Sequence, residues 1–266
     1  MGTLVFVGAG LSGAMSLSLE AVEVMKSADT VFIEQYTTFI DTSLAEGIRR
    51  LTGARTVNVG REEVENGEKL LSAAETGMAV LVAGGESMSA TTHMSLRIEA
   101  AGRGIKTRVV FGPSIFTAAA AILGLHQYKF GRTVTIPRFQ KGYRPLSPFI
   151  TLNSNAGAGV HTLALLDVDS EHGYFMAPGE AFTEMLEVGQ ELGKRSIDGT
   201  AVACTVSRAG LASCETHAGR IGRLKGMDFG APPHCIVIPG RLHFQEAEAL
   251  KLFSGALDEE LSAITD

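Results

Sequence analysis

The chain has 266 residues, of which 45% are hydrophobic and 20% charged, and its formal net charge at pH 7 is −6. This balance predicts a fully folded globular protein, and the negative charge argues against an extended nucleic-acid-binding surface. We expect no secretory signal, because "MGTLVFVGAG" lacks a basic region. We also expect no membrane span, because the most apolar later stretch, "SIFTAAAAILGL", has about half the length that a span needs.

Short apolar runs rich in β-branched residues alternate with helical patterns in the first half of the chain. The predicted strands cover residues 3–8, 30–35, 78–84 and 107–112. Between the first two, "SLEAVEVMKSAD" places Leu19, Val22 and Met25 on one face of a helix. This alternation predicts a mostly parallel sheet, whose ligands bind beyond the carboxyl ends of the strands.

The second half of the chain has a different pattern. Residues 136–149 and 153–159 are predicted as loops, because they are rich in Pro, Gly, Asn and Ser. Strands are predicted at 160–168, 199–206 and 234–240, and a last helix at 244–253. We therefore predict an α/β protein with two domains, residues 1–112 and 113–266, with the boundary near Gly112–Ser114.

The first predicted strand runs into "VFVGAGLSG", which has the spacing G-x-G-x-x-G through Gly8, Gly10 and Gly13. With Glu34 at the end of the next strand, this pattern matches a dinucleotide-binding loop. In such a loop the third glycine lies inside the following helix, which faces the pyrophosphate. Here the best N-cap is Ser16 or Ser18, so a flexible loop would separate the glycines from the helix. A tight turn with positive φ explains the first two glycines equally well, and we do not favour a dinucleotide.

Polar loops also follow the third and fourth predicted strands, at "VAGGESMSATTH" (82–93) and "GPSIFTAA" (112–119). Ser114 is a candidate N-cap of a helix that ends at Gly124. Three such loops at adjacent strand ends predict a pocket for a ligand that offers hydrogen bonds and a flat ring. Because none carries the lysine of a P-loop, a nucleoside triphosphate is not expected.

Further segments follow in a distinctive order, through "GVHTLALLDV", "SRAG" and "DFGAPPHCIVIPGRLHFQEAEAL". Together with "VGAGL", "SLEAVEVMKSADTVFIEQYTT", "SATTHMSLRIEA" and "GPSIFTAAAAILGLHQYKFG", they span nearly the whole chain. In this joint order the sequence resembles the tetrapyrrole-methylase-like class of S-adenosylmethionine-dependent methyltransferases, and within it the diphthine synthase family. "ATTH", "GLHQYKFG" and "GAPPH" are the parts that resemble this family rather than its corrin-methylating relatives.

The resemblance implies a homodimeric enzyme of two α/β domains, with a mixed sheet in the second and S-adenosylmethionine in the cleft between them. It implies methylation of the amino group of a modified histidine, 3-carboxy-3-aminopropyl-histidine, on translation elongation factor 2, as a step of diphthamide biosynthesis. Archaeal members are taken to stop at the trimethylammonium form, whereas eukaryotic ones add an ester. The cofactor contacts that it implies are Leu11, Glu86, Ser89, Ser114, Ile115, Leu166, Ala209 and His234.

This chain departs from the family at Glu86 and Ser89. The family has a G-D-P-like turn at the first position, and an apolar residue is common at the second. A glutamate still accepts hydrogen bonds or offsets a sulfonium charge, but its extra methylene shifts the carboxylate. Whether Glu86 replaces the family's acid is therefore a question for the structure.

Transfer of a methyl group from a sulfonium requires alignment and a dry cavity rather than a metal, and no metal-binding spacing is present. The candidate general bases are His93, His126 and Asp167, and we assign none of them. The alternative to catalysis is packing or helix capping for the two histidines, and turn capping for Asp167 and Asp169.

Other polar residues have two interpretations as well. Tyr36 either lines the acceptor site or packs in the core. Three cysteines are predicted to pack as small apolar residues in a cytoplasmic protein: Cys204, Cys214 and Cys235.

Two basic stretches bear on the protein substrate. Residues 131–149 contain four basic residues and no acid, and residues 219–226 contain three more. These are Arg132, Arg138, Lys141, Arg144, Arg220, Arg223 and Lys225. They dock the acceptor protein, with Phe139 and Tyr143 as anchors, or they are solvated loops. A tetrapyrrole methyltransferase and, less favoured, a nicotinamide-dependent oxidoreductase or a cofactor-bound regulatory module stay open as alternatives.

Overall fold

The structure is a computed structural model that describes residues 2–36, 42–193 and 197–266, and the chain divides into two compact units. The first unit comprises Met1–Ile115 and Val168–Tyr174, and the second comprises Phe116–Asp167 and Phe175–Asp266. The predicted boundary at Gly112–Ser114 lies next to the first crossing between the units. The prediction of one boundary does not include Val168–Tyr174, which belong to the first unit although they lie within the second half of the chain.

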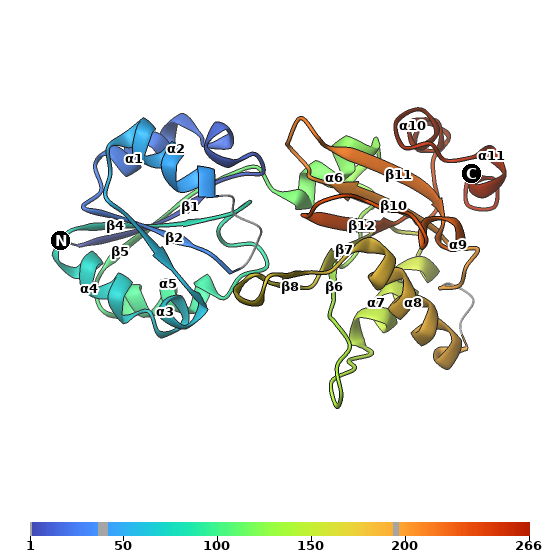
Figure 1. The fold of residues 1–266 in the computed structure, drawn as a ribbon, viewed down its shortest axis with the longest axis horizontal. Helices are drawn as coiled ribbons and strands as arrows, with labels where there is room; N and C mark the ends of the chain where they lie inside the picture. The colour runs from blue at the N-terminus through green and yellow to red at the C-terminus, as the bar shows by residue number, and fades with distance from the viewer. Residues whose placement is uncertain (1, 37–41, 194–196) are drawn as a thin grey trace. The chain divides into compact units, whose positions relative to one another are not determined.

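The first unit is built around a five-stranded sheet in which every strand pair is parallel, in the order β3-β2-β4-β1-β5 (Figure 1). Its strands are β1 (Thr3–Gly8), β2 (Thr30–Glu34), β3 (Thr56–Val59), β4 (Met78–Ala83) and β5 (Lys106–Val110). Its helices are η1 (Gly13–Ser16), α1 (Leu19–Lys26), α2 (Thr42–Thr52), α3 (Arg61–Asn66), α4 (Glu68–Thr76) and α5 (His93–Gly102). The unit also holds β8 (Val168–Asp169), η3 (Ser170–His172) and the first residue of β9 (Tyr174–Phe175).

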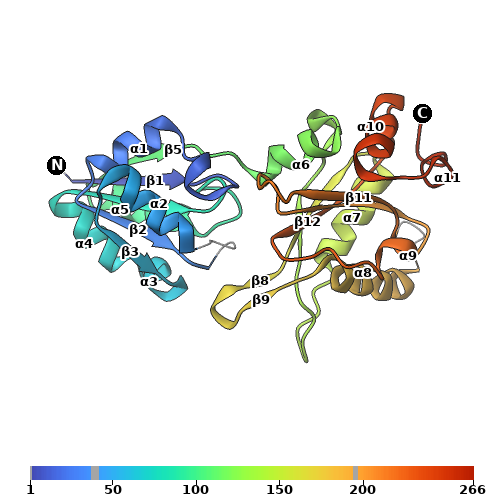
Figure 2. The ribbon, with the colours of Figure 1, turned by 45° about the horizontal axis from the view of Figure 1, so that its top comes forward.

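Strand residues alternate between the two faces of this sheet, and each face buries its own apolar cluster. Val5 and Val7 of β1 pack with residues of α1 and α2, whereas Leu4 and Phe6 pack with residues of α3, α4 and α5. Figure 1 shows these two helix layers on opposite sides of the strands, and Figure 2 shows the same elements turned by 45°. Because both faces are covered, the inner strands β1, β2 and β4 are largely apolar, which is why the sequence predicted them.

The second unit contains a mixed sheet in the order β11-β10-β12-β7-β6, in which the β6–β7 pair is parallel and the other pairs are antiparallel. Its strands are β6 (Val134–Ile136), β7 (Thr162–Leu166), β10 (Val202–Ser207), β11 (Glu215–Arg220) and β12 (His234–Ile238). Its helices are η2 (Gln127–Lys129), α7 (Ser147–Gly157), α8 (Pro178–Leu192), α9 (Ile221–Leu224), α10 (Phe244–Ser254) and α11 (Asp258–Leu261), with α6 (Ile115–Leu123) beginning at the unit boundary. The predicted fold class, with one parallel and one mixed sheet, is confirmed.

The prediction of a loop over residues 153–159 is wrong, because α7 continues to Gly157. Phe149, Leu152 and Asn155 recur along one buried side of this helix. The Asn155 amide donates hydrogen bonds to the Arg132 carbonyl at 2.8 Å and to the Thr162 hydroxyl at 2.9 Å. These tertiary contacts outweigh the low helix propensity of the Asn, Ser and Gly residues.

The helix after the first glycine loop begins where predicted but buries a different face. Ser18 is the N-cap of α1, and its hydroxyl accepts a hydrogen bond from the Ala21 amide at 3.1 Å. The buried residues are Ala21, Val24 and Met25, whereas Leu19 is 86% exposed. The prediction that Leu19, Val22 and Met25 form the buried face is therefore wrong. The face that is buried is rotated by about one residue around the helix axis.

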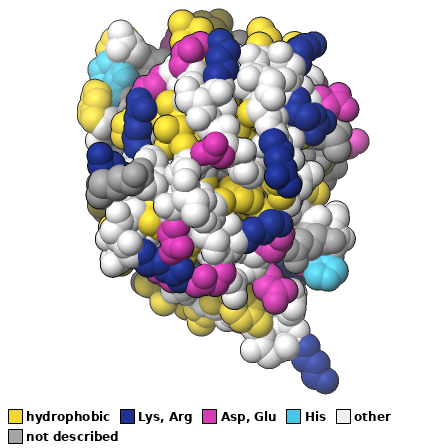
Figure 3. All heavy atoms as spheres, turned by 90° about the vertical axis from the view of Figure 1, so that its left-hand side faces the viewer, with side chains coloured by type: hydrophobic (Ala, Val, Ile, Leu, Met, Phe, Trp, Pro, Cys, Tyr) yellow, Lys and Arg dark blue, Asp and Glu magenta, His cyan; other side chains and the backbone are white. Residues whose placement is uncertain are grey.

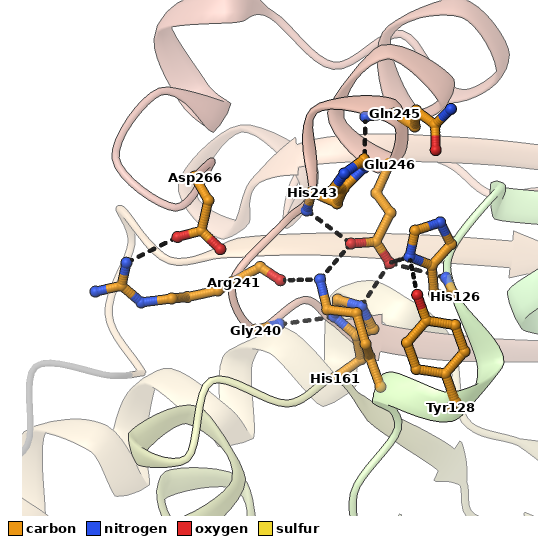
Figure 4. A network of polar contacts seen from close by, with 10 residues as sticks. His126, Tyr128, His161, Gly240, Arg241, His243, Gln245, Glu246 and Asp266 are labelled. Atoms are coloured by element: carbon orange, nitrogen blue, oxygen red, sulfur yellow. Dashed lines mark hydrogen bonds and ion pairs between the residues drawn. The ribbon is translucent and has the colours of Figure 1, made fainter.

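Glu246 stands at the centre of a buried polar network in the second unit (Figure 4). Its carboxylate accepts hydrogen bonds from the backbone amides of His126 and His243, both at 2.8 Å, and forms an ion pair with Lys129. It also accepts a hydrogen bond from Nε2 of His161 at 2.9 Å. The other ring nitrogen of His161 accepts a hydrogen bond from the Gly240 amide, so its proton is on Nε2. The network joins the start of α10 to η2 and to the residue preceding β7.

Charged side chains of both signs are interspersed on the face of the molecule shown in Figure 3. The first unit contains ion pairs such as Lys69–Glu63 and Arg103–Glu99. None of the helices in the described ranges combines the length and the hydropathy needed to cross a membrane.

Candidate functional site

The ends of β1, β4 and β5 meet through glycine backbones. A Cβ atom added to Gly8 would lie 2.6 Å from the Gly85 carbonyl oxygen and 2.7 Å from the Gly112 nitrogen. Real side chains do not approach this closely, so Gly8 is required by close packing rather than by the positive φ that the sequence suggested. Beyond it, Gly10 and Gly85 exchange two backbone hydrogen bonds, of 3.0 and 2.9 Å, and both have positive φ. The carboxyl ends of three adjacent strands are thereby fixed as one backbone platform.

Leu11 begins the segment between this platform and α1. Residues Gly13–Ser16 form the 3-10 helix η1, and the Ser16 hydroxyl accepts a hydrogen bond from the Ser12 amide at 2.6 Å. The two serine hydroxyls also contact each other at 2.7 Å. The expectation of a flexible loop here was wrong, because local hydrogen bonds from serine side chains order it.

Glu86 and Ser89, the two departures from the family pattern, are hydrogen-bonded to each other. The Ser89 hydroxyl donates to the Glu86 carboxylate at 2.8 Å, and the Met88 amide donates to the same oxygen at 3.0 Å. The longer glutamate thus closes a turn of its own loop. A hydroxyl at position 89 suits this carboxylate, as an apolar side chain would not.

Ser114 and Ile115 lie at the start of α6, at the boundary of the two units. Ser114 directly precedes the helix, and Gly124, with φ of +72°, directly follows it. The helix therefore has the start and the end that the sequence predicted. Ile115 is its first residue.

The remaining three predicted contacts lie at one end of the second sheet. The register of β7, β12 and β10 brings Leu166, His234 and Ser207 into one row, because Leu165 pairs with Cys235 and Ser207 pairs with His234. Nδ1 of His234 lies 2.8 Å from the Ser207 hydroxyl. Burial and then the nearby Arg208 guanidinium lower the pKa of His234, so its ring is neutral at pH 7.

Ala209, 7% exposed, follows a strained residue that the sequence did not reveal. Arg208 has φ of +54°, and its guanidinium donates to the carbonyls of Ser213, Phe229 and Ala231. These contacts, together with an ion pair to Glu215, hold the turn after β10. The sequence did not predict that Arg208 holds this turn, because its hydrogen-bond partners lie up to 23 residues away along the chain.

Each of the three candidate bases has a structural partner or a buried position within its own unit. His93 is fully buried, and His126 is stacked on Tyr128 with its Nδ1 3.7 Å from Glu246. The Asp167 carboxylate accepts a hydrogen bond from the Arg138 amide at 2.8 Å.

The other polar candidates have structural partners too. Tyr36 packs in a core cluster, where Arg61 lies over its ring at 5.1 Å and burial raises the pKa of its hydroxyl. Asp169 accepts hydrogen bonds from His172. Burial raises the pKa of the Cys204 and Cys235 thiols, which keeps them protonated. Within the described residues, no group of three His, Cys, Asp or Glu side chains is placed to hold a metal ion.

The basic stretches are partly neutralised by acids that are distant in sequence. Arg144 pairs with Glu191 and Glu187 of α8, and Arg138 lies 4.0 Å from Glu180. Arg223 pairs with Glu260 at 2.8 Å. Lys141 and Tyr143 are exposed, in a hairpin closed by backbone hydrogen bonds between Gln140 and Tyr143.

Comparison with known proteins gives one consistent result. Residues 3–224 match the family model of the Tetrapyrrole (Corrin/Porphyrin) Methylases. Diphthine synthase of Methanosphaerula palustris is 37% identical over 253 residues, covering 95% of this chain and 98% of the relative. Diphthine synthase of Methanosarcina mazei is 38% identical over 258 residues, covering 95% and 96%. A crystal structure of diphthine synthase superposes with a TM-score of 0.88 at 32% identity, covering 98% of this chain and 99% of the other.

These similarities cover both structural units, and they favour neither the nicotinamide-dependent oxidoreductase nor the tetrapyrrole-specific alternative. The dinucleotide interpretation also loses its acid, because Glu34 is fully buried against His93. The chain is a methyltransferase that belongs to the tetrapyrrole methylase family and, within it, to the diphthine synthases.

Proposed function

We propose that this enzyme uses S-adenosylmethionine to methylate the amino group of 3-carboxy-3-aminopropyl-histidine on translation elongation factor 2, a step of diphthamide biosynthesis. The observation that carries the proposal is similarity at 37–38% identity over 95% of the chain to proteins named diphthine synthase. A homodimer in the cytoplasm is part of the same proposal.

The glycine platform of the first unit leaves room for a ligand beside its backbone. A Cβ atom added to Gly85 meets no atom within 4 Å, so a ligand has room to approach the backbone there. Glu86 adds a carboxylate directly after it, which offsets a positive charge or accepts hydrogen bonds. Leu11, Glu86, Ser89, Ser114 and Ile115 are the proposed contacts on this unit, and Leu166, Ala209 and His234 are the proposed contacts on the other.

S-Adenosylmethionine, when bound, supplies a methyl group already activated by a positively charged sulfur. The residues of this chain then have to align the acceptor nitrogen and exclude water. The bound cofactor would give up this methyl group to the acceptor nitrogen and keep the carbon–sulfur bond electrons on sulfur, and the nitrogen would have to lose a proton beforehand. An amine with a pKa of about 8 is partly neutral at pH 7, so this proton can pass to solvent and a strong protein base is optional.

Binding and mass measurements test this proposal. We expect S-adenosylhomocysteine, but not NADH, to bind in isothermal titration calorimetry. With S-adenosylmethionine, elongation factor 2 carrying the modified histidine should gain mass in multiples of one methyl group. NADH binding, or methylation of a corrin but not of the elongation factor, would contradict the proposal.

Replacing Glu86 with alanine should weaken S-adenosylhomocysteine binding by about tenfold, which corresponds to one charge-assisted hydrogen bond. Ser89→Ala is the matched variant, because it removes the same intraloop hydrogen bond but leaves the carboxylate in place. Calorimetry should show a smaller loss for Ser89→Ala. Equal losses would mean that Glu86 only orders its loop.

A further inference from the structure

Glu34 and His93 form a buried polar pair beneath the loop after β4. Both side chains are fully buried, and Nε2 of His93 lies 3.2 Å from a carboxylate oxygen of Glu34. Glu34 is the last residue of β2 and His93 the first residue of α5. The pair therefore links two elements that are 59 positions apart in the chain.

The other nitrogen of the His93 ring reaches the loop itself. Nδ1 donates a hydrogen bond to the Ser87 carbonyl oxygen at 2.6 Å, and the Thr91 hydroxyl donates to the same oxygen at 3.1 Å. Since a carbonyl only accepts, Nδ1 carries a proton. The contact between Nε2 and the Glu34 carboxylate is attractive only with a second proton on one of those two atoms, because neither could otherwise donate. The imidazole thus connects the Glu34 carboxylate on one side to the backbone of the loop on the other.

Ser87 lies between the two residues that distinguish this loop. Glu86 precedes it and accepts hydrogen bonds from the Met88 amide and the Ser89 hydroxyl. Upstream, Gly85 is fixed by its two hydrogen bonds to Gly10. Two contacts therefore fix the loop. Gly85 is bonded to Gly10, just after β1, and the Ser87 carbonyl is bonded to the His93 ring.

A buried pair of ionisable side chains in an apolar core is not expected to make the protein more stable than apolar residues would. The ring of Phe6 lies 6.4 Å from that of His93, and an apolar cluster surrounds them. Replacing a buried ionisable pair with apolar residues of similar volume is often neutral or stabilising. This pair also holds a backbone carbonyl through a hydrogen bond, which fixes the direction of that carbonyl. Apolar side chains cannot make such a bond.

We infer that Glu34 and His93 are positioning residues, which fix the Ser87 carbonyl and so orient Glu86 and Ser89 toward the methyl donor. The inference rests on the proposed function for its ligand but concerns residues that the sequence resemblance did not assign. It gives Glu34 a role different from that of the acid in a dinucleotide-binding loop, the pattern that the glycine spacing matched.

Two variants of His93 separate positioning from stability. The amide nitrogen of Asn can occupy the place of Nδ1 and keep the bond to the Ser87 carbonyl, whereas that of Gln can occupy the place of Nε2 and keep the contact with Glu34. We expect His93→Asn to bind S-adenosylhomocysteine within about threefold of the wild type, although it unfolds at lower temperature. We expect His93→Gln to unfold nearer the wild-type temperature but to bind about tenfold more weakly, the factor expected for one hydrogen bond.

Hydrogen exchange in the ligand-free protein gives a second readout. His93→Gln should speed exchange of the amides of residues 86–90, and His93→Asn should restore the wild-type rate. Failure of the wild type to bind S-adenosylhomocysteine would refute the proposed function. If the wild type binds and affinity follows thermal stability across the variants, or exchange rates do not change, the positioning role is refuted instead.

Discussion

Replacing Glu246 with alanine should lower the free energy of unfolding by about 3–5 kcal/mol, the usual effect of removing one partner from a buried charged network. The substitution leaves the Lys129 ammonium, the His161 ring and the amides of His126 and His243 without their shared acceptor. Urea unfolding measures the change. Glu246→Gln, which keeps the volume but turns an amide NH2 toward these donors, should show a smaller loss in the same direction.

Glu248→Ala is the matched control on the same helix. Glu248 is exposed and pairs with Lys251 one turn away, so its removal should change the unfolding free energy by less than about 0.5 kcal/mol. S-Adenosylhomocysteine affinity should not change in the control. A similar loss of stability for both variants would show that the buried network contributes nothing beyond a surface ion pair.

The same carboxylate predicts how stability depends on pH. Burial alone would raise the pKa of Glu246, but hydrogen bonds from Lys129, His126, His243 and His161 lower it from 4.5 to about 2. Because the folded-state pKa is depressed, the stabilisation is complete above pH 4.5 and is lost as the pH falls from 4.5 toward 2. The shift corresponds to about 3 kcal/mol, and Glu246→Gln should flatten this part of the stability profile.

Local patterns in the sequence were sufficient to predict four of the five strands of the first sheet, β1, β2, β4 and β5. Strands such as β1 and β4 are buried on both faces, so apolar runs identify them, and Ser18 marks the start of α1 by its own hydrogen bond. β3 and β11 were missed, because they are partly exposed and lack such runs. Predictions from local patterns fail where solvent exposure removes the pattern.

In the candidate site, too, local patterns predict the positions of some residues but not the tertiary contacts of others. Glycine spacing correctly located the loop at the end of β1, but it could not show that Gly8 meets backbone from two other strands. The partnership of Glu34 with His93 depends on the order of strands in the sheet, which no local motif encodes. In contrast, Glu86 and Ser89 are only three residues apart, so their hydrogen bond is a local contact, although it was not predicted.

The second large effect on stability is expected from a substitution in the glycine platform, where Gly8, Gly85 and Gly112 meet. Gly112→Ala should destabilise the protein by at least about 3 kcal/mol, the upper end of what overpacking costs, because the obstructing atoms are backbone and cannot rotate away. The added Cβ would lie 2.4 Å from the Gly8 carbonyl oxygen and 2.7 Å from that of Gly85. The strand ends would have to separate, so S-adenosylhomocysteine affinity should fall together with stability.

Two other glycines provide controls for the separate parts of this argument. Gly102, the last residue of α5, has open space at its Cβ position and no positive φ, so Gly102→Ala should leave affinity unchanged and alter stability by less than about 1 kcal/mol. Gly85 also has open space but a φ of +64°, so Gly85→Ala should cost about 1 kcal/mol in strain. If the methyl donor lies against this backbone, Gly85→Ala should reduce affinity far more than this small loss of stability explains. Wild-type affinity in Gly85→Ala, measured by calorimetry on folded protein, would place the ligand elsewhere.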